Sequence, residues 1–114
     1  TYGDGSWQGF IDKKRLDVII DMGARTSIHS VSADFMQVVG AEVFLPESVL
    51  ISVSDDGTSF TELKQYTSKV NKEEAIKFIS VSWEGNAKGR YIRYQACAGE
   101  EFGGWIFTDE IVVK

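Results

Sequence analysis

The side chains that could act in catalysis are few in this chain. His29 is the only histidine and Cys97 the only cysteine among the 114 residues. A catalytic nucleophile needs a neighbouring base and a group that orients the base. His29 falls within an alternating apolar and polar stretch, where a surface or packed histidine is expected, and no motif brings it to Cys97. We therefore expect Cys97 to fill a small apolar gap as a buried thiol.

Carboxylates are the second candidate chemistry, because glycoside hydrolysis needs two of them facing one sugar across about 5 to 10 Å. Acidic residues occur in adjacent pairs at positions 55–56, 73–74 and 100–101. Adjacent side chains of an extended backbone point to opposite sides. Turn formation explains the first pair and solvation explains the other two. The sequence therefore predicts no catalytic dyad, and we expect this domain by itself not to be an enzyme.

Oxygen-bearing side chains near both ends of the sequence could bind calcium, which takes several oxygen ligands. The candidates are Asp4, Ser6 and Glu110. From residue types alone, solvated surface charge is the simpler interpretation of these three residues. The Gly3-Asp4-Gly5 segment is not a phosphate loop, because no helix and no lysine follow it in the required pattern.

Aromatic residues in or beside the longest expected loops, residues 36–48 and 97–104, and Trp7 near the start of the chain suit ligand binding rather than catalysis. Aromatic faces stack on the C–H faces of sugars, while amides, acids and arginine bind the hydroxyl groups. The aromatic candidates are Trp7, Phe35, Phe44, Phe102 and Trp105, and the polar candidates are Gln37, Glu42 and Glu100. Many sandwich aromatics belong to the core, so we expect at least two of the five aromatics to be buried.

Composition limits the partners. A chain of 114 residues suits one domain with its own core. With 12 basic and 17 acidic side chains, the net charge is −5, which disfavours nucleic acids and anionic membrane surfaces. One cysteine excludes an internal disulfide framework and a multi-thiolate zinc site. No apolar run approaches the ~18 residues of a membrane span, so we expect no membrane insertion.

Short strands must position these side chains. Residues 16–21 are rich in β-branched side chains and stop at Gly23, which predicts a strand. In residues 28–35 apolar and polar side chains alternate, with Ile28 offset by a bulge, which predicts a half-buried strand. Residues 49–53 also alternate, and Asp-Asp-Gly-Thr follows as a hairpin turn in which Gly57 takes a positive φ.

The second half of the chain continues in the same way. Residues 75–81, 90–96 and 105–113 are expected to be strands, with Ile92, Tyr94 and Ala96 sharing one face. Seven or so strands, 11 glycines between short apolar runs and no convincing long helix predict an all-β fold. Alternation favours antiparallel pairing, since buried parallel strands read as continuous apolar runs. We therefore expect a single antiparallel β-sandwich over residues 1–114.

The order of the strand sequences resembles a known family. Together they resemble the discoidin, or coagulation factor 5/8 type C, domain, a galactose-binding-like jelly roll whose superfamily includes carbohydrate-binding module family 32. A closer resemblance is to the C-terminal domain of Bacteroides-type chitobiases, the β-N-acetylhexosaminidases of glycoside hydrolase family 20. The segments that carry the resemblance are residues 7–10 (WQGF), 16–23 (LDVIIDMG), 27–37 (SIHSVSADFMQ), 45–60 (LPESVLISVSDDGTSF), 89–96 (GRYIRYQA) and 105–113 (WIFTDEIVV).

The resemblance assigns roles to single residues. It implies that Asp21 and Gly23 end a strand in a tight turn, and that Tyr91 and Ile92 belong to the scaffold. Many carbohydrate-binding relatives place a calcium-ligating glutamate where this chain has Glu110, and Ser6 matches a nearby ligand position. The family's first calcium loop falls before Thr1 or at Asp4-Gly5. We therefore expect a C-terminal fragment of a larger enzyme that lacks the first strand or loop of its domain.

Two functions follow from this resemblance. The first is a non-catalytic accessory module that holds a β-N-acetylhexosaminidase at glycans ending in GlcNAc, GalNAc or galactose, in a periplasmic, outer-membrane-associated or secreted parent protein. Trp105 and Phe44 would form its stacking platform, with Phe102 as a substitute, and Gln37 and Glu100 would bind hydroxyls. The second is a structural module that packs on the parent's catalytic domain or on another protein and binds no sugar.

Overall fold

Six antiparallel strands and no helix make up the part of the chain that the structure describes. The structure is a computed structural model, and it describes residues 6–11, 15–38, 46–67, 76–97 and 108–114. The strands are β1 (Ser6–Ile11), β2 (Arg15–Val38), β3 (Ser48–Ser54), β4 (Thr61–Thr67), β5 (Ile76–Cys97) and β6 (Thr108–Val113). The order across the sheet is β1-β2-β5-β3-β4, and β6 pairs with β2.

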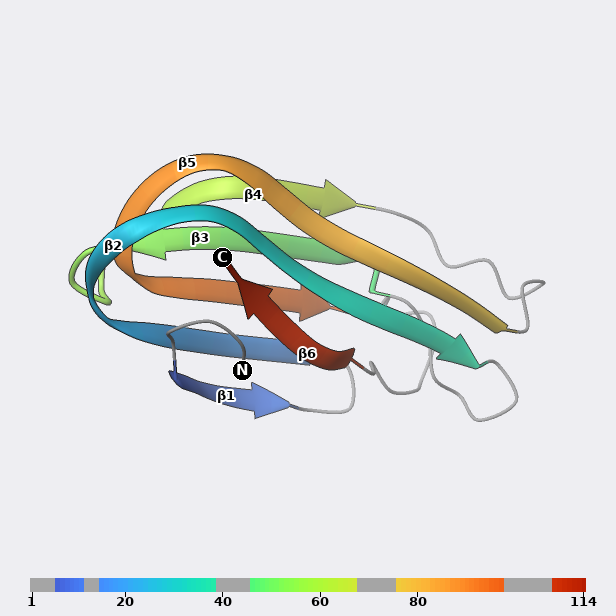
Figure 1. The fold of residues 1–114 in the computed structure, drawn as a ribbon. Coiled ribbons are helices and arrows are strands. Elements are labelled where there is room, and N and C mark those ends of the chain that lie inside the picture. The colour runs from blue at the N-terminus through green and yellow to red at the C-terminus, as the bar shows by residue number, and fades with distance from the viewer. Residues whose placement is uncertain (1–5, 12–14, 39–45, 68–75, 98–107) are drawn as a thin grey trace.

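Two strands are long enough to run through both layers of the fold. β2 has 24 residues and β5 has 22, and both fold over at the same end of the molecule (Figure 1). Their pairing shifts register between Asp21 and Thr26 and again between Ile28 and Ser30, which is where the strands turn. One continuous hydrogen-bonded ribbon therefore supplies both layers of a sandwich.

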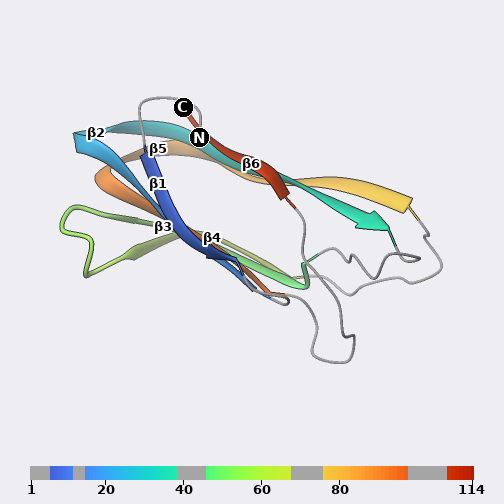
Figure 2. The same ribbon diagram turned by 90° about the horizontal axis from the view of Figure 1, so that it is seen from below.

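The two layers differ in their strands (Figure 2). The large layer, as we call it, consists of β1, β3, β4 and the paired segments 15–21 of β2 and 91–97 of β5. The small layer consists of the paired segments 30–38 of β2 and 76–84 of β5, with β6 added to β2. The predicted antiparallel β-sandwich is thereby confirmed.

The core lies between the layers and follows the two-residue period of the strands. Tyr94 is fully buried, and its ring packs 6.2 Å from that of Phe35 across the interior. The Tyr94 hydroxyl donates to the carbonyl of Val81 at 3.0 Å, and burial raises the pKa of this phenol. The other buried apolar residues are Leu16, Val18, Ile20, Ile28, Val31, Ala33, Val49, Ile51, Val53, Val81, Ile92, Ala96, Ile111 and Val113.

Most predicted strands are confirmed, including the bulge after Ile28 and the positive φ of Gly57, which is 80°. Two predictions about these strands are wrong. The strand predicted for residues 16–21 does not stop at Gly23, because the backbone turns there at φ 86° and continues in β2. Cys97 is half-buried rather than buried.

Phe35, one of the five candidate aromatics, is 1% exposed and belongs to the core. It shares the inward side of β2 with Val31 and Ala33, so its ring cannot stack on a ligand at the surface. Trp7 lies in β1, but its side chain is not described, and Phe44, Phe102 and Trp105 lie outside the described residues.

One carboxylate holds the corner where the long strands fold over. Asp21 Oδ1 accepts the backbone N–H of Gly23 at 2.8 Å and the Nε–H of Arg90 at 2.8 Å. Its second oxygen accepts Arg90 Nη2–H at 3.0 Å, so the guanidinium binds in the two-pronged geometry that suits a carboxylate. These bonds, led by those from Arg90, lower the pKa of Asp21 to about 2. The tight turn expected at Asp21 and Gly23 is therefore present, and it links β2 to β5.

A second glycine fixes how closely β5 approaches β3 near this corner. A Cβ atom at Gly89 would lie 2.3 Å from Val53 Cγ2 and 3.0 Å from the carbonyl oxygen of Ser54. Val53 is buried and Ser54 contributes backbone, so neither atom can move aside cheaply. Only glycine fits at this crossing.

Replacing Asp21 with Asn should destabilise the domain at neutral pH, because the corner loses its charge-assisted bonds. The pKa of Asp21 in the folded state, about 2, lies below its ordinary value of 3.8. Asp21 therefore stabilises the fold fully above pH 4, and this contribution disappears as the pH falls towards 2. Urea unfolding at pH 7 and pH 3 measures this. An equal loss of stability for Asp21→Asn and wild type between these pH values would contradict the assignment.

Replacing Gly89 with Ala should cost about 1–3 kcal/mol in the free energy of unfolding, as overpacked sites do. Gly85→Ala is the matched control. There the new Cβ would meet only a partly buried side chain, the ring of Trp83 at 2.8 Å, and no backbone atom. Urea melts of the two variants should show a clearly larger loss for Gly89→Ala, and equal losses would contradict this account.

Candidate functional site

The strand ends opposite the corner define the first candidate site. Ser48, at the start of β3, is the pairing partner of Cys97, at the end of β5, and the N–H of Glu47 donates to the Cys97 carbonyl at 2.8 Å. In the sequence, segment 39–45 precedes β3 closely and segment 98–107 directly follows β5, so both adjoin these neighbouring strand ends. These segments contain the predicted binding residues Phe44, Glu100, Phe102 and Trp105, which themselves lie outside the described residues.

Gln37 is the one predicted sugar-binding residue whose side chain is described. It lies near the end of β2 and is 1% exposed. Its position two residues after Phe35 places it on the inward side of the strand. Its amide therefore does not reach the surface, contrary to the prediction that it binds sugar hydroxyls.

The predicted calcium ligands lie on different strands. Ser6 in β1 pairs with Asp21, whereas Glu110 in β6 precedes Ile111, which pairs with Ala33. β1 belongs to the large layer and β6 to the small one, so strand pairing does not bring the two residues together. Asp4 and the side chains of Ser6 and Glu110 are not described, and the described residues contain no group of three metal-ligating side chains. Calcium stays a prediction.

His29 and Cys97 lie at opposite ends of the fold. His29 is exposed at the fold-over, where its Nδ1 is 3.1 Å from Asn86 Oδ1 and its backbone N–H donates to the Lys114 carbonyl at 2.7 Å. Cys97 lies at the other end of the large layer, opposite Arg15. The structure therefore does not bring the only histidine to the only cysteine.

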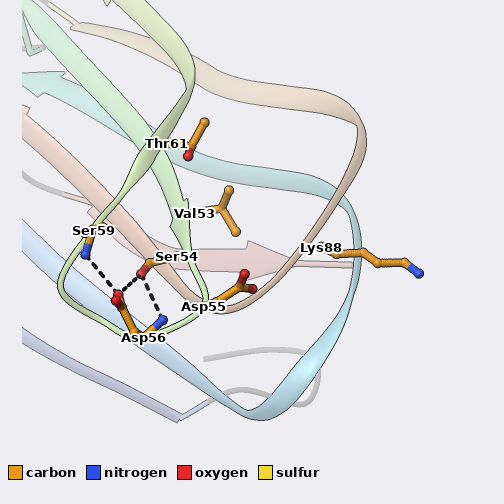
Figure 3. Close-up of a pocket in the computed structure, with 7 residues that line it drawn as sticks. All are labelled: Val53, Ser54, Asp55, Asp56, Ser59, Thr61 and Lys88. Carbon is orange, nitrogen blue, oxygen red and sulfur yellow. Dashed lines mark hydrogen bonds between the residues drawn. The ribbon is translucent and has the colours of Figure 1, made fainter.

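A polar pocket of about 200 Å³ lies beside the β3–β4 hairpin, at the fold-over end (Figure 3). Asp56 Oδ1 accepts Ser54 Oγ–H at 2.9 Å and the N–H groups of Thr58 and Ser59 at 2.8 and 2.9 Å. These bonds lower the pKa of Asp56. The residues that line the pocket are Val53, Ser54, Asp55, Asp56, Ser59, Thr61 and Lys88.

Asp56 therefore maintains the hairpin, as the sequence predicted, and the remaining groups determine what the pocket could bind. Asp55 accepts Arg25 Nε–H at 3.1 Å, with both side chains more than half exposed. Lys88 extends from β5 away from the other lining residues (Figure 3). The remaining carboxylate and hydroxyl groups can hydrogen-bond a small polar molecule, although the lining contains no aromatic ring. The sequence did not reveal this pocket, because only the folded β5 brings Lys88 to the hairpin.

Comparisons with known proteins complete this geometry. No protein-family model and no curated protein sequence matches the chain. Solved structures do match. CpGH89CBM32-5 from Clostridium perfringens, in complex with GalNAc-β-1,3-galactose, aligns over 97% of this chain and 76% of its own, with a TM-score of 0.60 and 13% identity.

Two further structures are similar. Chitosan-binding module 1 of a Paenibacillus chitosanase/glucanase aligns over 96% of this chain and 76% of its own, with a TM-score of 0.60 and 17% identity. The C-terminal domain of a Bacteroides fragilis chitobiase aligns over 90% and 64%, with a TM-score of 0.54 and 19% identity. The chain therefore shares the β-sandwich fold of these three structures. The resemblance found in the sequence is thereby confirmed for the fold.

This chain spans only part of the length of each of these structures. For the chitobiase domain the aligned share is 64% of its length. None of the described residues forms a helix that is long and apolar enough to cross a membrane.

Chelation tests the calcium prediction directly. If Glu110, Ser6 and Asp4 bind calcium, removing it with EDTA should lower the melting temperature, and added calcium should restore it, because binding to the folded state stabilises it. Glu110→Gln should abolish the response to calcium. Identical melting curves of the wild type with EDTA and with millimolar calcium would contradict the prediction.

Proposed function

We propose that this chain is a carbohydrate-binding accessory module of a glycoside hydrolase. The observation that carries the proposal is the fold, which is shared with modules that are named for carbohydrate binding. A tethered module of this kind raises the effective concentration of substrate at a catalytic domain without chemistry of its own. Fold similarity at 13–19% identity does not identify the binding residues, which depend on the side chains of this chain.

The proposed binding site is the end of the sandwich opposite the corner. Trp105 and Phe44, with Phe102 as a substitute, supply aromatic faces for the C–H face of a sugar, and Glu100 binds hydroxyl groups. Support comes from the pairing of Ser48 with Cys97, since the segments that carry these residues connect to adjoining strand ends. The rings are separated in sequence by more than fifty positions, yet only a few residues separate Phe44 and Trp105 from the described strands β3 and β6.

The proposed parent enzyme is a chitobiase-like β-N-acetylhexosaminidase of the periplasm, the outer membrane or the extracellular space. The similarity to a chitobiase C-terminal domain supports this choice. The proposed ligands are glycans with a terminal GlcNAc, GalNAc or galactose, and the neighbour in complex with GalNAc-β-1,3-galactose supports this class. The acidic net charge of −5 favours neutral glycans over polyanions.

Titration with GlcNAc, GalNAc and galactose, followed by two-dimensional NMR, tests the proposal. Because a single small site gains little net binding energy, we expect millimolar affinity and fast exchange. Resonances of residues 46–48, 97 and 108 should shift. Trp105→Ala should weaken binding about fivefold to tenfold, whereas Trp105→Phe keeps an aromatic face and most of the affinity.

Glu62→Gln is a control for this experiment, since Glu62 is exposed in β4 and takes no part in the proposed site. The proposal fails if none of the three sugars shifts any resonance at millimolar concentration. Such a result would favour the alternative of a structural or protein-interaction module that binds no sugar.

A further inference from the structure

The outward side of the small layer carries an ordered set of polar side chains. Ser80, Ser82 and Glu84 alternate along β5 with Val81, which faces the core. On β2, the polar residues Ser30, Ser32 and Asp34 alternate with the buried residues Val31, Ala33 and Phe35 in the same way. Strand pairing sets these outward residues side by side, as Ser30 with Glu84, Ser32 with Ser82 and Asp34 with Ser80.

These side chains line a groove rather than a flat surface. Its volume is about 410 Å³, twice that of the hairpin pocket. β6 forms one side, where Val112 pairs with Ser32 and Lys114 follows. The lining residues are Ser30, Ser32, Ser80, Ser82, Glu84, Val112 and Lys114. The groove thus offers hydroxyls that donate and accept, a carboxylate that accepts and an ammonium that donates.

An exposed aromatic ring continues the groove along β5. Phe78 is 69% exposed, and it is the exposed large apolar side chain among the described residues. It lies on the same outward side as Ser80, two residues away. Asp34 accepts the Ser80 hydroxyl hydrogen at 2.5 Å, so a fixed polar pair separates the ring from the rest of the groove.

We propose that this face of the small layer is a second binding site that takes an extended, neutral glycan chain. We use the name serine groove for the groove's lining residues together with Phe78 and Asp34. The class of ligand rests on the proposed carbohydrate-binding function. The site is distinct from the loop site, because it is formed by strand residues on the outer side of the sandwich. Nothing in the comparisons assigns it.

The length and the chemistry of the groove select this ligand. From Phe78 to Glu84 the strand rises about 20 Å at roughly 3.3 Å per residue, which suits several linked sugars better than one terminal sugar. Phe78 supplies a stacking face, and the hydroxyls and charges supply bonds to a row of hydroxyl groups. A polyanion would meet both Asp34 and Glu84. A protein partner would find only Phe78 and the half-buried Val112 as apolar side chains among the described residues of the groove, whereas protein interfaces need a larger apolar centre.

Binding of a linear N-acetylglucosamine hexamer to the whole chain, measured by calorimetry and by NMR, tests the proposal. Phe78→Ala should weaken hexamer binding about fivefold to tenfold, and Phe78→Tyr should restore it, because tyrosine keeps the ring. Ser82→Ala should weaken it as well. Trp105→Ala should leave the shifts of residues 30–34 and 78–84 intact, and Glu62→Gln should change neither site. The exposure of Phe78 makes loss of folding a minor concern, and melting curves of the variants check it.

The outcomes separate this proposal from the proposed function. If the hexamer shifts only residues beside the loop segments and Trp105→Ala abolishes all binding, the serine groove is not a site, while the proposed function stands. If GlcNAc does not bind but the hexamer shifts residues 78–84, the groove is confirmed and the loop site fails. Absence of binding by GlcNAc, GalNAc, galactose and the hexamer overturns both.

Discussion

The rest of the structure depends on the fold-over of β2 and β5 at one shared corner. The two strands pair from Arg15 with Cys97 to Val38 with Ile76, so a single ribbon builds both layers. At the corner, the Asp21 carboxylate binds the backbone of its own strand at Gly23 and the guanidinium of Arg90 on the other. The remaining described strands extend this ribbon, with β1 and β6 added to β2, β3 added to β5, and β4 added to β3.

This construction makes the two ends of the molecule different. At the corner the long strands themselves cross between the layers, with two shifts in their pairing. The strand ends Val38, Ser48 and Cys97 lie at the opposite end, and sequence that joins strand ends can vary without disturbing the ribbon. The proposed sugar site, made of residues between strands, therefore belongs at that end, whereas a site near the corner must use strand residues or the β3–β4 hairpin.

The sequence predicted the parts of the fold that depend on local alternation and turn chemistry. The inward side of residues 31–35, the bulge after Ile28 and the conformation of Gly57 are of this kind. The prediction from sequence failed at Gly23. A glycine with positive φ gives the same local signal whether the strand ends there or turns and continues. The alternation places Phe35 and Gln37 on the inward side of the strand, whereas their residue types alone suggest binding at the surface. The serine groove needs β2, β5 and β6 together, and no local pattern shows that.

The two outer faces of the sandwich differ in how their side chains are paired, and this difference affects where a ligand can bind. On the large layer, Arg93 binds the Asp17 carboxylate with two bonds of 2.9 and 2.6 Å, and its guanidinium lies 5.8 Å from the Phe60 ring centre. The hydrogen bonds to Asp17 raise the pKa of Arg93, so the guanidinium stays charged and bound to this carboxylate. A ligand that used either group would have to break this bidentate bond. Such charge-assisted bonds are among the stronger contacts that a surface makes, so breaking one costs binding energy. On the small layer, by contrast, the Phe78 ring of the serine groove is exposed. The face that binds a chain at least cost is therefore that of the small layer.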